Sequence, residues 1–123
     1  MNNRFTKILL LLGILWMPIL SFGQDNCSGN LTLSTQAEVD AFDCEVFSGS
    51  LTISGSDINN LNGLNALKEV TGDIIITGNI QLKEINLPNL IIVKSRLSIS
   101  DNIGLTVILV PELKTIGTGA FSR

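Results

Sequence analysis

Three consecutive stretches of 23 residues decide the fold of this chain: GSLTISGSDINNLNGLNALKEVT (residues 49–71), GDIIITGNIQLKEINLPNLIIVK (72–94) and SRLSISDNIGLTVILVPELKTIG (95–117). Five positions of the unit are aliphatic in every copy. They are the third (Leu51, Ile74, Leu97), the fifth (Ile53, Ile76, Ile99), the sixteenth (Leu64, Leu87, Val110), the nineteenth (Leu67, Leu90, Leu113) and the twenty-second (Val70, Val93, Ile116). Chance rarely aligns five aliphatic columns at one period, so the stretches are repeats of one structural unit.

Each unit opens with an alternation such as LTIS at 51–54, which has the period of two of a β-strand. A turn rich in Gly, Asn and Asp follows, and the return contains LPNL at 87–90 and VPEL at 110–113, where proline disfavours helix at the residue before it. Only stacked units can bury both sides of such a strand. We therefore predict a mainly β protein, a right-handed parallel β-solenoid with 23-residue rungs. The alternative is an antiparallel sandwich, but its hairpins need turns every ~8–12 residues.

A shorter unit of 20 residues comes first, since GNLTLS at 29–34 matches GSLTIS at 49–54. Thr35 and Glu38 then have the spacing of a helix-capping box, in which the Thr35 side chain accepts from the Glu38 amide. A short helix is expected over 35–44, the only one in the exported part of the chain.

Residues 1–23 have the features of a secretory signal peptide. A basic start leads into the apolar run 8–20, and small residues precede a cleavage point between Gly23 and Gln24. The run of 13 residues is shorter than the ~18–20 that a membrane anchor, the alternative interpretation, requires. We therefore expect export, cleavage and no membrane span afterwards.

The exported chain then divides into three parts. Residues 24–48 are expected to form an N-terminal cap with the first short rung, and 49–117 the three full rungs. Residues 118–123 have the pattern of a further rung that is cut short, so the preceding rung would present an uncapped edge through which copies could stack.

Both cysteines, Cys27 and Cys44, lie in the exported part, where an oxidising environment favours a disulfide. Two buried thiols or a metal pair are the alternatives. A tetrahedral zinc site is not complete with two cysteines in a chain that has no His, so no metal is expected.

Composition narrows the function further. The 123 residues include 8 Lys and Arg against 11 Asp and Glu, and removal of the leader leaves 6 against 11, a net charge of −5. Such an acidic domain is not expected to bind nucleic acid or anionic membranes. The chain has no His and no Tyr, so it lacks the usual general base, and the carboxylates have the pattern of a solvated surface. We expect neither catalysis nor a cofactor.

Asparagines recur in the turns after the strands, at Asn79 and Asn102. The favoured interpretation is an amide ladder from rung to rung that satisfies backbone groups of the turns. The alternative is a calcium site in which Asp57 and Asp101 join these asparagines, but the dense Asp-x-Asp-x-Asp pattern of calcium loops is missing.

The candidate binding site is the outward strand column with its flanking positions. If the rungs stack, these small side chains form one flat Ser/Thr-rich face. The candidate residues are Thr52, Ile75, Thr77, Arg96, Ser98 and Ser100, with Thr32, Ser50, Ser54 and Asp73 beside them. An ordinary solvated strand surface is the alternative, because the face has no aromatic anchor.

The strand, the turn, the LPNL and VPEL motifs and the closing Val or Ile before residues such as Gly117 together resemble the receptor L domain, a leucine-rich-repeat-like β-solenoid. Bacterial secreted proteins with tandem copies of this unit are similar as well. The resemblance covers roughly residues 26–117. It implies an N-terminal helix tied by a disulfide, which Cys27 and Cys44 would form here, and a role in ligand binding.

The sequence thus predicts a non-enzymatic recognition or adhesion module, secreted or displayed on a Gram-negative bacterial surface, for a protein or glycan partner. The alternative is a structural spacer that extends a larger solenoid and has no ligand of its own.

Overall fold

The computed structural model describes residues 27–117 and 120–122. The signal peptide expected at residues 1–23 and its cleavage point lie outside the described residues. The helices and strands are α1 (Gln36–Ala41), the 3-10 helix η2 (Asn62–Leu64), β2 (Ser28–Leu33), β3 (Val46–Ile53), β4 (Glu69–Val70), β5 (Ile74–Thr77), β6 (Glu84–Asn86), β7 (Ile92–Val93), β8 (Arg96–Ser100), β9 (Val107–Leu109), β10 (Thr115–Ile116) and β11 (Ala120–Ser122).

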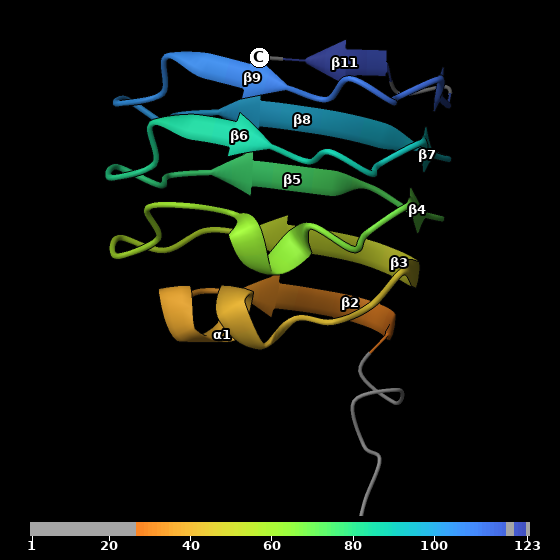
Figure 1. Ribbon diagram of the computed structural model, residues 1–123, viewed down its shortest axis with the longest axis horizontal. Coiled ribbons are helices and arrows are strands. Elements are labelled where there is room, and N and C mark those ends of the chain that lie inside the picture. Colours follow the sequence, from red (N-terminus) through yellow and green to blue (C-terminus); the bar gives the residue numbers. More distant parts are fainter. Residues whose placement is uncertain (1–26, 118–119, 123) are drawn as a thin grey trace, which may run out of the picture.

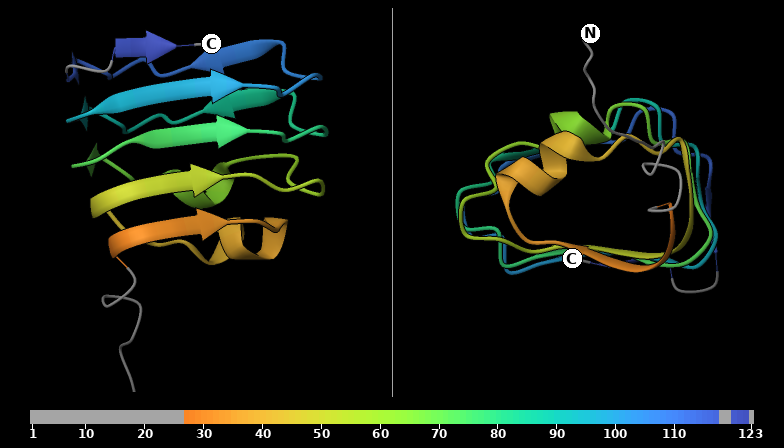
Figure 2. Two further views of the ribbon diagram at one scale, coloured as in Figure 1. Left: turned by 180° about the vertical axis from the view of Figure 1, so that it is seen from behind. Right: turned by 90° about the horizontal axis from the view of Figure 1, so that it is seen from below.

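The strands stack as the walls of a solenoid. The longest wall consists of β2, β3, β5, β8 and β11, in that order (Figure 1). The first residues of β3 pair instead with β4, from which β7 and β10 continue a second wall, while β6 and β9 form a third. Seen along the stack, the rungs nearly superimpose as a flattened ring (Figure 2, right).

The strand register reproduces the sequence repeat. Leu51 pairs with Ile74, which pairs with Leu97, so each step from rung to rung advances by one unit of the repeat. The short first unit joins in the same way, because Leu31 pairs with Leu51. Every strand pair within the described part of the chain is parallel, which confirms the predicted parallel solenoid and excludes the antiparallel sandwich.

The predicted aliphatic columns form the core. In the first two full rungs all of their residues are buried, whereas Val110, Leu113 and Ile116 of the third are only partly buried. The columns miss a second set of core residues, Ile58 and Leu61 in one rung and Leu82 and Ile85 in the next. The first pair stands one position earlier in its unit than the second pair, so a comparison at a fixed period does not align them.

The N-terminal helix begins as predicted but is shorter. Thr35 is the N-cap and accepts a hydrogen bond from the Glu38 amide at 3.1 Å, which confirms the capping box. The helix ends at Ala41 and not near residue 44, because Phe42 is extended and its ring lies in the core beside Phe47, with 6.1 Å between the ring centroids.

The prediction that this would be the only helix is wrong, since η2 forms a single 3-10 turn in the first full rung. The side chain of Asn60 accepts from the Asn62 amide at 3.0 Å and so starts the turn. Gly63 allows η2 to approach α1 closely, because a Cβ at this position would collide with the Val39 carbonyl. The two short helices therefore pack together at the N-terminal end.

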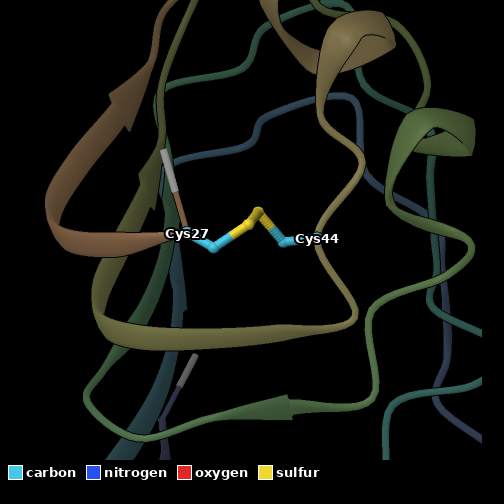
Figure 3. The surroundings of a disulfide bond; sticks show 2 residues. All are labelled: Cys27 and Cys44. Atoms are coloured by element: carbon cyan, nitrogen blue, oxygen red, sulfur yellow. A yellow bond between two sulfur atoms is a disulfide. The ribbon is translucent and has the colours of Figure 1, made fainter. Parts of the chain in front are cut away.

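The disulfide between Cys27 and Cys44 is present (Figure 3). It joins the start of β2 to the segment after α1, with 5.8 Å between the two Cα atoms. The bond therefore closes the first rung across its interior, and the predicted N-terminal disulfide is confirmed.

Candidate binding face

The outward column of the long wall lies in register from rung to rung. Thr32 pairs with Thr52, Thr52 with Ile75, and Ile75 with Ser98. Thr32 is exposed and the other three are half-buried, as expected for small side chains that stand side by side on a sheet. The structure thus places three of the predicted site residues, Thr52, Ile75 and Ser98, on one face, which we call the strand face.

The predicted residues at the end of the strand face bond to one another. The hydroxyls of Thr77 and Ser100 lie 3.1 Å apart and share a hydrogen bond. Ser100 also lines a cavity of about 170 Å³ with Asn102 and Leu105. One hydrogen-bonding position of each hydroxyl is therefore used within the protein, which leaves the others for a partner.

At the opposite end of the strands, Arg96 is paired with Asp73. Their Nη2 and Oδ2 atoms lie 3.1 Å apart, and the side chains are 48% and 23% exposed. Ser50 accepts from the Asp73 amide at 3.2 Å and so holds the residue in place. The pair adds little stability at such exposure, but it cancels the only positive charge among the predicted site residues.

The asparagine ladder forms in the turns that follow β5 and β8. The side-chain nitrogen of Asn79 donates to the side-chain oxygen of Asn102 at 2.9 Å and to the backbone carbonyl of Ile53 at 3.0 Å. The Asn79 side-chain oxygen accepts from the Gly55 backbone at 2.8 Å. Asn79 is fully buried and its backbone N–H also donates to the Asn102 side chain at 2.9 Å, so these bonds between rungs confirm the predicted ladder.

Potential metal ligands come together at one place in the described residues. Within this part of the chain, Cys27, Asp43 and Cys44 are the one group of potential metal ligands. The two sulfurs are joined in the disulfide and so offer no thiolate. The backbone and side-chain hydrogen bonds of Ser34 hold the pKa of Glu38 below its ordinary value, so this carboxylate is charged at neutral pH.

Sequence reasoning missed a second concave feature, a cavity of about 300 Å³ between β2 and α1. Leu31 of β2 and Phe42 after α1 line it, together with the carboxylates of Glu38 and Asp43. The repeat pattern gives no signal for this cavity, because it depends on the distance between a strand and a helix that belongs to no full rung.

A stack of parallel rungs with a disulfide-tied N-terminal end defines a class of protein, the parallel β-solenoids. Residues 43–122 match the family model of the receptor L domain, and because this is more than half of the chain, the protein belongs to that family. Receptor L domains are non-catalytic, ligand-binding modules of extracellular receptor regions. The family and the disulfide both suggest an extracellular location.

No curated protein and no solved structure shows significant similarity to the chain. Within the described residues, the helices are too short or too polar to cross a bilayer.

Proposed function

We propose that this receptor L domain is an exported recognition or adhesion module of a Gram-negative bacterial surface, and that the strand face binds a protein or glycan partner. The observation that carries the proposal is the register of the strand face, which brings Thr52, Ile75 and Ser98 side by side from three different rungs. Side chains that are distant in the sequence therefore form one surface.

The chemistry of this face favours many weak contacts over one tight contact. Its side chains are small hydroxyls around a single half-buried aliphatic residue, Ile75. Aromatic anchors, which dominate most tight interfaces, are missing from the strand-face columns of the described rungs. Hydroxyls both donate and accept, which suits sugar hydroxyls and protein backbone groups alike. Useful avidity would then come from several copies acting together.

Export is supported by two independent features. The leader at residues 1–23 has the composition of a signal peptide, and the Cys27–Cys44 disulfide is a bond that oxidising compartments preserve. Protease treatment of intact cells tests the surface location: digestion of the protein while a periplasmic marker survives supports it, and full protection contradicts it.

A structural spacer is the second candidate. Two contacts favour it, because the Arg96–Asp73 pair and the Thr77–Ser100 hydrogen bond show polar groups of the face satisfying one another. In that case the rungs serve to set a distance, and the strand face is only solvated surface.

A bead-adhesion assay separates the two candidates. Beads that carry many copies of the protein are allowed to settle on glass coated with mucin, which presents both glycans and protein, and the force of detachment is measured. Recognition predicts that Thr52→Asp and Ile75→Asp each reduce the force severalfold, whereas the control Asn65→Asp, exposed and outside the strand face, leaves it unchanged. Equal adhesion by all variants, with unchanged thermal unfolding, would favour the spacer.

A further inference from the structure

Among the described residues, a cavity of about 300 Å³ lies between β2 and α1 at the N-terminal end of the solenoid. The two elements stand on opposite sides of this cavity when the stack is seen from below (Figure 2, right). The lining is mostly apolar, with Leu31, Leu33, Ala41, Phe42 and Cys44, and it also contains Thr32 and the acidic side chains of Glu38 and Asp43. The volume is at the lower end of the range of ligand sites, ~300–1,000 Å³.

One edge of β2 faces this end of the solenoid without a strand partner among the described residues. The carbonyls of Cys27 and Leu33 accept from Ser48 and Ser54, so alternate residues of β2 face β3. The residues between them, such as Thr32, therefore direct their backbone N–H and C=O groups to the other edge. That edge offers a row of donors and acceptors to an added strand.

Natural proteins usually protect such an edge with Lys, Pro, a bulge or a cover. The strand SGNLTL at 28–33 contains neither charge nor proline. The apolar column gives a further reason for an added strand: Leu51 is fully buried between rungs, whereas Leu31 has a described rung on one side only and is half-buried. An apolar side chain from below would bury Leu31 in the same way.

The negative charge beside the cavity favours an extended segment that carries a positive charge. Glu38 and Asp43 are both exposed at the cavity, and the hydrogen bonds from Ser34 keep Glu38 ionised. Among the cavity residues there is no positive side chain to neutralise them. A Lys or Arg of the partner would do so, with its methylene stem along the apolar lining.

We propose that this end of the protein is a second interaction site, distinct from the strand face, which binds an extended peptide segment of a partner protein. The segment adds as a strand to the free edge of β2, places alternate apolar side chains beneath Leu31 and Leu33, and sets a basic side chain against Glu38 and Asp43. Backbone hydrogen bonds supply affinity in this mode, and the alternating side chains supply specificity.

The test uses the protein expressed with its own leader and two fluorescent seven-residue peptides. Both alternate valine and threonine; one has lysine at each end and the other has glutamate. Fluorescence anisotropy should show saturable binding of the lysine peptide and at least about tenfold weaker binding of the glutamate peptide, a difference that shrinks at high salt.

Variants locate the site. Ala41→Trp fills the cavity from an exposed position, and Thr32→Pro blocks the free edge without removing a bond to β3. Each should weaken the lysine peptide by about tenfold or more. Asp43→Asn should weaken it by about threefold, and the matched control Asp101→Asn, at the far end of the stack, should not change it.

Thermal unfolding of each variant verifies that the fold is retained. Because Ala41→Trp and Thr32→Pro change separate elements, the site can be tested even if only one of the two variants folds. The proposal is overturned if the lysine peptide does not saturate at millimolar concentration, or if it binds folded Ala41→Trp or folded Thr32→Pro as tightly as the parent. Thr52→Asp on the strand face should leave peptide binding unchanged, so failure of one site is distinguishable from failure of the other.

Discussion

Replacement of Asn79 by Ala removes the centre of the asparagine ladder, and its effect can be estimated from the contacts. The side chain is fully buried, accepts one hydrogen bond from the Gly55 backbone, and donates one to the Ile53 carbonyl and one to the Asn102 side chain. Asn79→Ala leaves these three groups without that partner, and each unsatisfied group costs about 1–3 kcal/mol.

Because Asn102 keeps its bond from the Asn79 backbone and Gly55 is partly accessible to water, the lower part of the range applies to them. The expected loss of unfolding free energy is therefore about 3 kcal/mol, out of a total of roughly 5–15 kcal/mol for a domain of this size. The melting temperature should fall by roughly 12–24 °C.

Urea and thermal unfolding followed by far-ultraviolet circular dichroism measure this loss. Asn65→Ala is the matched control, since Asn65 is exposed and its backbone carbonyl, which accepts from Asn89, is retained. A loss below about 1 kcal/mol for Asn79→Ala, with the control unchanged, would refute the view that the ladder stabilises the turns.

Three further predictions concern the ends and corners of the stack. Loss of the disulfide, with its sequence separation of 17, through Cys27→Ser with Cys44→Ser should lower the urea-unfolding free energy by about 3 kcal/mol, and a reductant should raise the mass of the denatured parent by about 2 Da. The folded-state pKa of Glu38 lies below its ordinary value of 4.5, so its contribution is complete above that pH and is lost as pH falls through the folded-state pKa. Acid titration of stability should therefore show a smaller decline for Glu38→Gln than for the parent, and identical curves would contradict it. Gly49 has φ +142°, and a Cβ there would collide with the Gly29 carbonyl, so Gly49→Ala should cost about 2–3 kcal/mol in the same urea assay; a neutral effect would show that the first two rungs can separate freely.

The parallel register could be predicted from sequence because a repeat leaves one simple solution. Leu51, Ile74 and Leu97 occupy the same position in units of equal length. When equivalent positions stack, the register of each strand against the next is fixed. The same argument predicted the ladder, since Asn79 and Asn102 share a position.

What escaped prediction depends on departures from the repeat. Ile58 and Leu61 stand one residue out of step with Leu82 and Ile85, and η2 arises from local asparagine and glycine contacts that the other rungs do not have. These features belong to one rung, so they cannot be predicted from the sequence repeat that all rungs share.

The candidate site was only partly predictable. Alternation placed Thr52 and Ile75 on an outward face, but it did not indicate that Arg96 would be neutralised by Asp73 or that Thr77 would bond to Ser100. To predict such pairings, one must know the distance between side chains on neighbouring rungs. To predict the N-terminal cavity, one must also know how α1 lies against β2, and the sequence repeat gives no information on this.

Four of the cross-rung bonds described above share one arithmetic property: Asp73 to Ser50, Thr77 to Ser100, Asn79 to Asn102 and Arg96 to Asp73 each span 23 residues. Excision or duplication of one whole unit would keep these positions in register between neighbouring rungs, whereas a single-residue deletion would misalign all of them beyond that point. We therefore expect genes for this fold to gain or lose whole repeat units. Insertions of a few residues should be tolerated only in the outer turns.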